Sequence, residues 1–233
     1  QRERLSAAQI VAQFAAAEER PQSLQRAYLQ LAEREQPLTD EARAALAQLA
    51  SARPEAHILL AEDSARREQP ADALLEIGRA LQAGASAAPW LHDSALRAWE
   101  ELRDRATPEV LDQLWQRARS GAEQRRPALA ALAMAALDHG LPPGASVGHQ
   151  ADEDEALVAD LGALHAGQIA PGAIERVART SLLPASVVRE RVLPRVRELA
   201  ADALPAGPLF FFPQRRPQLV EVLEAPPTSI YGG

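Results

Sequence analysis

The chain has 233 residues, with 25 basic and 32 acidic side chains, a net charge of −7 and no cysteine. Because both signs of charge are interspersed, no basic stripe is present that would gather phosphate contacts, so nucleic-acid partners are not expected. The absence of cysteine excludes disulfides and thiolate metal sites. No apolar run approaches the roughly 18 residues that a membrane-spanning helix needs, so the chain is not expected to cross a membrane.

The composition favours helices. Alanine, leucine, arginine, glutamate and glutamine dominate, and aromatic residues make up only 4% of the chain. An all-α protein is therefore expected. Every basic residue is arginine, which together with the excess of alanine is typical of a GC-rich bacterial genome.

The first residue is Gln1 and not methionine, which suggests a missing front end. A removed signal peptide, a lipoprotein leader or anchor, or a simple chain boundary would each explain it. A periplasmic or envelope-associated bacterial protein is expected, with a cytoplasmic location as the alternative.

Eight amphipathic helices are predicted in the first 140 residues, over 5–18, 21–35, 39–51, 54–68, 71–83, 90–104, 108–120 and 124–139. Their apolar residues recur at steps of three and four, as in Leu74, Ile77 and Leu81. Proline, glycine or capping residues separate the helices, which should pair as antiparallel hairpins. Trp99 and Trp115 are expected to lie in the best-packed part of the core.

Several residues mark helix ends. Thr39 and Thr107 are predicted N-caps, the second followed by a proline at the first helical position. Gly84, Gly121 and Gly140 stand where left-handed C-caps are expected.

A phrase recurs near the start of the chain. Residues 31–37, Leu-Ala-Glu-Arg-Glu-Gln-Pro, return at 64–70 as Ser-Ala-Arg-Arg-Glu-Gln-Pro, a shift of 33 residues. Residues 45–54 return less closely at 80–89, a shift of 35. A period of this size indicates stacked helix-turn-helix units, each too small to bury its own apolar face.

The region from about residue 21 to 121 resembles tetratricopeptide (TPR) repeats in its period, its closing prolines and its small residues where paired helices touch. The matching residues are Ala42, Leu46 and Pro54 in one unit and Ala65, Leu81 and Pro89 in the next. The aromatic positions of the family are mostly Leu or Ala here. The resemblance implies a right-handed α-solenoid over residues 1–140, with a concave surface that binds a peptide, a helix or another subunit, and no intrinsic catalysis.

The last third of the chain has a different character. Residues 141–151 concentrate helix breakers and are predicted to form a linker. A second helical section is predicted over 152–204, opened by a capping box at Asp152 and Glu155, with Pro194 either kinking the last helix or opening a new one. Residues 205–233 are too rich in proline for a helix and are predicted to form an extended, Pro/Phe-rich C-terminal arm.

No catalytic, cofactor-binding or metal-binding residue is predicted, and the chain is not expected to be an enzyme. No two of the five histidines share a helix face, and no phosphate-binding loop is present. A metal-dependent domain in residues 141–233 stays as an alternative. It would require His149, His165 and the acidic residues 152–155 to converge, although a solvated acidic helix start explains those acids.

Arginines recur along the predicted solenoid, at Arg66 and Arg67, at Arg97, and at Arg125 and Arg126, and could clamp the carboxylates of an extended peptide. Solvated helix faces would also explain them. The residues predicted to bind a partner are Arg66, Trp90, Arg97, Phe210, Phe211, Phe212 and Tyr231.

Two of these predictions leave alternatives open. Trp90 follows a proline at a turn and is either a core residue or a groove anchor. The rings of Phe210, Phe211 and Phe212 cannot all point to one side of an extended chain, so at least one must find a second surface, on the protein's own helices or on a partner.

The sequence therefore predicts a non-enzymatic scaffold or adaptor within a larger bacterial assembly, which binds other protein subunits or peptides through its helical surface and its C-terminal arm. A chaperone-like binder of extended client peptides is the alternative.

Overall fold

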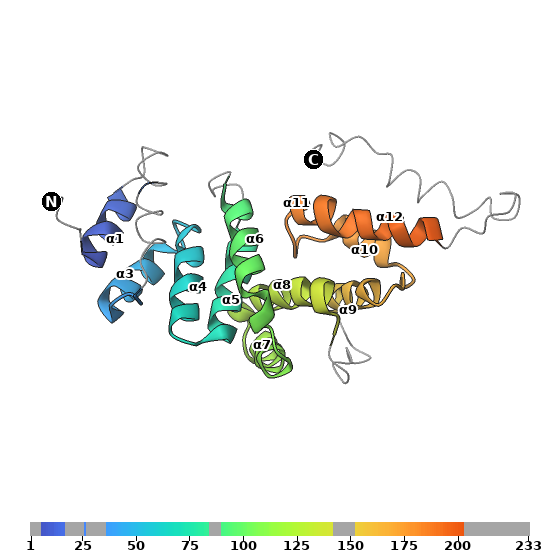
Figure 1. The fold of residues 1–233 in the computed structure, drawn as a ribbon, viewed down its shortest axis with the longest axis horizontal. Coiled ribbons are helices and arrows are strands. Elements are labelled where there is room, and N and C mark those ends of the chain that lie inside the picture. Colours follow the sequence, from blue (N-terminus) through green and yellow to red (C-terminus); the bar gives the residue numbers. More distant parts are fainter. Residues whose placement is uncertain (1–5, 17–25, 27–35, 84–89, 142–151, 203–233) are drawn as a thin grey trace, which may run out of the picture.

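The computed structural model describes residues 6–16, 26, 36–83, 90–141 and 152–202 (Figure 1). Within these ranges the chain is helical and contains no strand, which confirms the expected all-α class. The principal helices are α1 (Ala7–Ala16), α3 (Asp40–Leu49), α4 (Ala56–Arg66), α5 (Pro70–Leu81), α6 (Leu91–Leu102), α7 (Pro108–Ser120), α8 (Ala122–His139), α9 (Glu153–His165), α10 (Ala173–Arg179), α11 (Ala185–Val187) and α12 (Leu193–Asp202).

Seven of the eight helices predicted in the first 140 residues are present, as α1 and α3 to α8, with ends close to the predicted ones. The helix predicted over 21–35 lies outside the described residues apart from Arg26. The predicted linker beyond Leu141 and the predicted arm over 205–233 also lie outside them.

Two of the predicted helix starts are capped as expected. The Thr39 side chain accepts a hydrogen bond from the Ala42 N–H at 3.3 Å, and Asp152 Oδ1 accepts one from the Glu155 N–H at 3.0 Å. Each satisfies a backbone donor that the first helical turn leaves without a partner.

At the start of α7 the expected cap takes another form. Thr107 occupies the N-cap position, but its side chain bonds no backbone N–H of the helix. The backbone N–H of Glu109 and the Thr107 hydroxyl instead hydrogen-bond the Glu109 carboxylate and hold its pKa below the usual value.

Of the glycines predicted as left-handed C-caps, Gly140 has a φ of +74° and ends α8. The prediction is wrong for Gly121, whose φ of −173° is extended. Gly121 alone joins α7 to α8, so it serves as the end of one helix and the start of the next, and an extended residue makes that turn. Gly84 lies outside the described residues.

Helices α1, α3, α4, α5 and α6 lie side by side in chain order (Figure 1). α3 contacts α1 and α4, α4 contacts α5 and α6, and α5 contacts α6 and α7. α4 and α6 run in the same direction, and α5 runs against both. α3 and α4 thus pack mainly on their neighbours in sequence, whereas α5 also packs closely on α8.

Helix α4 stands between two apolar clusters. The N-terminal cluster consists of Ile10, Val11, Leu38, Ala42, Leu46, Ala50, Ala56, Leu59 and Leu60. The main core begins at Ile58 and extends through the later helices to Val196. Because Leu59 and Leu60 belong to one cluster and Ile58 and Ala61 to the other, α4 is buried on both sides.

Helix α8 is the most deeply buried helix of the described residues. Its residues 128–136 are all buried, and it packs against α5, α7 and α9. A helix that is apolar all round belongs in the interior, and the small alanines of this stretch let its neighbours approach closely. The closest approach is at Gly78 of α5, where an added Cβ would overlap the carbonyl oxygen of Pro127. Trp99 and Trp115 are both buried in this main core, as expected.

The second helical section shares the main core, because Leu157, Leu182, Val187 and Val192 are part of it. Between α11 and α12 the helix makes a π turn over Val188–Val192, in which the N–H of Leu193 bonds the carbonyl of Val188. α12 then begins, with Pro194 in its first turn. Pro194 thus lies just after the π turn, within an uninterrupted helical run over residues 185–202, and no new helix opens at it.

Candidate binding surface

Asp63 is the centre of a buried polar network that joins α4 to the segment before α3. Its side chain is fully buried. Oδ1 accepts the Leu38 N–H at 2.6 Å. Oδ2 accepts Nη1 of Arg43 at 2.6 Å and Nε of Arg67 at 3.0 Å. A buried carboxylate is stable only when its charge is compensated and its oxygens are hydrogen-bonded, so these partners fix how α3 sits against α4.

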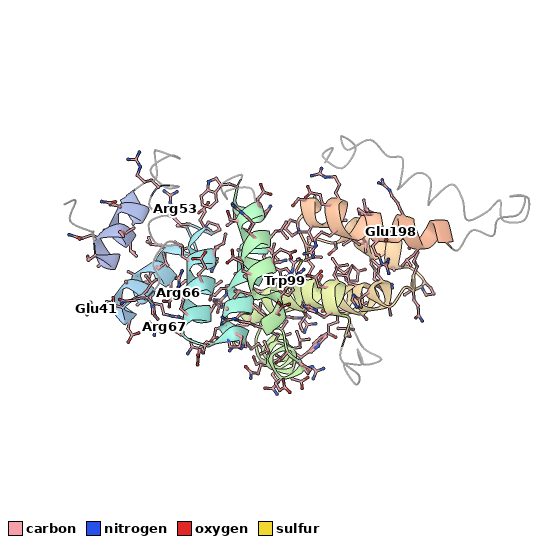
Figure 2. All side chains as sticks on the ribbon, viewed as in Figure 1. Glu41, Arg53, Arg66, Arg67, Trp99 and Glu198 are labelled. Atoms are coloured by element: carbon pink, nitrogen blue, oxygen red, sulfur yellow. The ribbon has the colours of Figure 1, made fainter. Side chains whose placement is uncertain are left out.

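Arg67 belongs to the recurring phrase and lies with Arg66 at the end of α4 (Figure 2). Its guanidinium also donates to the Leu38 carbonyl at 2.6 Å and pairs with Asp40 at 3.1 Å. The charge of Asp63, followed by hydrogen bonds to both carboxylates, raises the pKa of Arg67. The interpretation of Arg67 as a peptide clamp is therefore replaced by an internal role.

A second arginine also donates a hydrogen bond to a backbone carbonyl of an earlier segment. Arg105 ends the short 3-10 helix Arg103–Arg105 after α6, and its Nη1 donates to the Ala65 carbonyl at 2.9 Å. Arg67 and Arg105 thus each tie the end of one helix to the backbone of a preceding element.

Asp138 joins three parts of the chain. Its Oδ2 accepts the indole N–H of Trp99 at 2.7 Å, and its Oδ1 accepts Nη2 of Arg191 at 2.6 Å. The same Nη2 lies 3.3 Å from Glu100. Arg191 is carried by the π turn, so this contact fixes the last helical run to α6 and α8.

Arg125 and Arg126 bind the acidic start of α9. Arg125 Nη2 lies 2.5 Å from Asp152 and 2.9 Å from Glu155, and Arg126 Nε lies 3.4 Å from Asp154. The prediction that Arg125 and Arg126 clamp a peptide is therefore not supported by their positions, because acids of the same chain already occupy both guanidinium groups.

These contacts shift two pKa values. The hydrogen bond to Asp152 is the largest cause of the raised pKa of Arg125. For Asp152, burial alone would raise the pKa, but hydrogen bonds from the Glu155 N–H and from Arg125 outweigh burial and lower it. Asp152 is thus held in its ionised form by its neighbours.

Asp160 is a third carboxylate held by an arginine. It is 6% exposed and forms a two-pronged pair with Arg176, at 2.6 Å from Nε and 2.9 Å from Nη2. The hydrogen bond to Asp160 is the main cause of the raised pKa of Arg176. Since Asp160 lies on α9 and Arg176 on α10, the pair orients these two helices.

The side chains of two histidines in the described residues have partners of their own. His57 Nδ1 lies 2.7 Å from Glu76, and His165 Nδ1 lies 3.1 Å from the Leu137 carbonyl. In the part of the chain that the structure describes, no group of three or more histidine or acidic side chains is placed to hold a metal ion. His149, which the metal-dependent alternative requires, lies outside that part.

Three of the residues predicted to bind a partner lie on α4 and α6, and we call them the α4–α6 face. Arg66 is half-buried near the end of α4, with Nη2 3.4 Å from Glu62. Trp90 is the N-cap of α6 and packs, partly buried, on the N-terminal cluster. Arg97 is exposed in the middle of α6 and donates to the Ser94 hydroxyl at 3.3 Å.

The α4–α6 face is elongated. Trp90 packs on the cluster that includes the first residues of α4, whereas Arg105, after the end of α6, bonds Ala65 near the end of α4. Trp90 and Arg66 therefore lie toward opposite ends of two adjacent helices. The 11-residue helix α4 is about 16 Å long, which sets the length of the face. The other predicted residues, Phe210, Phe211, Phe212 and Tyr231, lie outside the described residues.

Sequence reasoning missed Asp63, Asp138 and Asp160, although one signal was available. Asp160 interrupts the apolar stretch Leu157–Leu161. A lone carboxylate among apolar helix positions must find a cationic partner when the helix packs. Spacing could have pointed to Arg67, four residues after Asp63, but not to Arg43 and Arg191, which lie 20 and 53 residues away from Asp63 and Asp138.

Comparison of the chain with known proteins found no match among family models, curated proteins or solved structures. None of the described helices has both the length and the apolar character needed to span a membrane.

Proposed function

We propose that this protein is a non-enzymatic scaffold or adaptor that binds other protein subunits or peptides. Its first 140 residues would form a TPR-like, right-handed α-solenoid. The row of α3 to α6, in which α4 packs on α3 and α5 and α5 packs on α6, supports this architecture.

The observation that carries the proposal is the use of two buried carboxylates, Asp63 and Asp160, and of the partly exposed Asp138. Asp63, Asp138 and Asp160 each bind an arginine from a different element. Groups arranged in this way fix the positions of helices, whereas a catalytic acid or base needs access to a substrate. A rigid helical frame of this kind serves best to present a surface.

The partner-binding surface we propose is the α4–α6 face. Arg97 is exposed and donates a 3.3 Å hydrogen bond within its own helix, so it can turn toward a ligand at small cost. Arg66 is half-buried and pairs with Glu62 at 3.4 Å, so it would contribute by exchanging Glu62 for a ligand carboxylate. An extended segment with acidic side chains fits two arginines on adjacent helices.

The C-terminal arm over 205–233 would act as a second anchor through its phenylalanines and Tyr231. The arginine-only composition supports a bacterial source, and a periplasmic or envelope location remains part of the proposal.

The test is affinity capture of the full-length chain from its native cells, followed by chemical cross-linking. The double variant Arg66→Glu/Arg97→Glu should lose the partner that the wild-type chain retains in stoichiometric amount. Arg189→Glu is the matched control, because Arg189 is an exposed arginine of the last helical run. Equal retention by the double variant and the wild-type chain would remove the α4–α6 face as the binding surface.

The role of the arm is tested separately by deleting residues 205–233. The helical circular dichroism of the truncated chain should stay near that of the full chain, while co-purification with the partner is lost. Unchanged co-purification would refute the anchoring role and leave the α4–α6 face unaffected.

A further inference from the structure

We propose that the π turn Val188–Val192 stores one extra residue between two fixed anchors, and so sets the register in which Arg191 meets Asp138. In this turn the N–H of Leu193 bonds the carbonyl of Val188, five residues before it. A regular α-helix bonds residues that are four apart, so the turn holds one residue more than an α-helical turn would. α11, the π turn and α12 follow one another in a single helical run (Figure 1).

The first anchor lies just before the turn. Leu182 and Val187 are buried in the main core. The side-chain amide of Gln82, the C-cap residue of α5, donates to the Leu182 carbonyl. Arg126 Nη2 donates to the Ser181 hydroxyl at 2.7 Å. These contacts fix the start of the run to α5 and α8.

The second anchor lies at the end of the turn and beyond it. Arg191 Nη2 lies 2.6 Å from Asp138 of α8 and 3.3 Å from Glu100 of α6. Val192 and Val196 are buried in the main core, at 1% and 5% exposure. The directions of the side chains before and after the turn are therefore set by different neighbours.

The side chains themselves disfavour a regular α-helix through this run. Each residue of an α-helix turns the chain by about 100°. If the first anchor stayed in place and the turn became α-helical, every later side chain would move to the place now held by the residue after it. Glu190 would then face Asp138 and bring like charges together. Arg195 would enter the buried place of Val196, which is costly for an unpaired charge.

Pro194 gives a second possible cause of the turn. A proline inside a regular α-helix clashes with the carbonyl four residues before it, which here belongs to Glu190. If the proline alone caused the turn, Pro194→Ala would let the run become α-helical, and Arg191 would leave Asp138. In our proposal the two anchors keep the turn in the Pro194→Ala chain.

This inference concerns how the last helical run is held, so it goes beyond the proposed function and needs no partner. The purified chain alone suffices to test it. A failure here leaves the α4–α6 face as the proposed binding surface.

The experiment deletes Glu190, an exposed residue of the turn, in the Pro194→Ala chain, so that neither the extra residue nor the proline remains. The matched control deletes Gln113, an exposed residue in the middle of α7, in the same chain. A regular helix has no residue to spare, so the control deletion must turn Leu114 and Trp115 away from the core. Thermal unfolding followed by circular dichroism gives the melting temperature of each chain.

We expect the Glu190 deletion to leave the melting temperature within about 3 °C of that of the Pro194→Ala chain, or to raise it, and the Gln113 deletion to lower it by about 10 °C or more. Arg191→Ala should lower the melting temperature by the same amount in the wild-type chain, in the Pro194→Ala chain and in the chain that also lacks Glu190. The reason is that Arg191 keeps its contact with Asp138 in all three.

Four results would overturn the inference. An equal loss for the two deletions would mean that the turn stores no spare residue. No loss from Arg191→Ala in the wild-type chain would mean that this residue is not an anchor. A loss that disappears in the Pro194→Ala chain would mean that the proline alone sets the register, and a loss that disappears only after the Glu190 deletion would mean that the second anchor has moved.

Discussion

Trp99 and Asp138 are joined by a 2.7 Å hydrogen bond from the indole N–H to Oδ2, across the interface of α6 and α8. Replacing Asp138 by alanine would deprive the indole N–H of its acceptor and the Arg191 guanidinium of the closer of its two carboxylate partners, Asp138 and Glu100. We expect the free energy of unfolding to fall by about 2 to 4 kcal/mol, the range for breaking a largely buried pair by removing one partner. Urea unfolding followed by circular dichroism measures this loss.

The control for this change is Asp112→Ala, which removes an exposed aspartate of α7. It should shift the free energy of unfolding by less than about 0.5 kcal/mol. Similar losses in the two variants would show that Asp138 does not hold the last helical run in place.

Asp63 and Asp40 both pair with Arg67, but Asp63 is fully buried and Asp40 is 92% exposed. Asp63→Asn should therefore destabilise the protein by about 3 kcal/mol, because it leaves Arg43 and Arg67 without a buried counter-charge. Asp40→Asn should cost less than about 1 kcal/mol, as exposed ion pairs do. Urea unfolding should give a lower midpoint for Asp63→Asn than for Asp40→Asn. Equal midpoints would contradict a central role for Asp63.

Gly78→Ala tests the close approach of α5 and α8. Its Cβ would overlap the Pro127 carbonyl, so the two helices must separate, with an expected loss of about 2 kcal/mol or more. Gly121→Ala is the matched change, because a Cβ there meets nothing within 4 Å and the backbone is extended. The melting temperature, measured by thermal unfolding, should fall for Gly78→Ala and stay the same for Gly121→Ala. An unchanged melting temperature for Gly78→Ala would contradict the close approach of α5 and α8.

The Asp152 carboxylate should make a small contribution to stability that depends on pH. Its pKa is lowered in the folded state, so ionised Asp152 stabilises the fold above its unfolded pKa of about 3.9. That contribution is lost as the pH falls through the lower, folded pKa. Because Asp152 is half exposed, we expect at most about 1 kcal/mol at neutral pH.

Asp152→Asn isolates the charge, since asparagine is also a good N-cap. The difference between the wild-type chain and this variant in urea unfolding should be present at pH 7 and should disappear in acid, as the carboxyl group of Asp152 becomes protonated in the folded state. A difference that persists at low pH would mean that the charge of Asp152 is not its cause.

Much of the fold followed from local chemistry. The three- and four-residue steps of apolar residues, with caps such as Thr39 and Asp152, were sufficient to predict the helices, because both signals act within one or two turns. The all-round burial of α8 was not predicted, since a run of alanines does not say how many neighbours will cover it. The extended Gly121 was missed because its conformation depends on how α7 meets α8.

The candidate binding surface was less predictable. Arg66, Arg67, Arg125 and Arg126 looked like Arg97 in sequence, yet these four pair with carboxylates of the same chain. Which arginine meets which carboxylate depends on contacts between distant elements. The charge of an arginine therefore does not show whether it pairs with a carboxylate of its own chain or is exposed and able to bind a partner.

The position of α4 between two apolar clusters has a consequence for how the molecule opens. The N-terminal cluster is built mainly from α1, α3 and one side of α4, and it can come apart while the main core around α8 stays intact. Amide protons of α1 and α3 should then exchange with solvent through a partial opening, and those of α8 only through global unfolding. The ion pair between Asp63 and Arg43 contributes to the free energy of this partial opening. We therefore expect the loss of this one buried carboxylate to make the first helices more accessible to proteases.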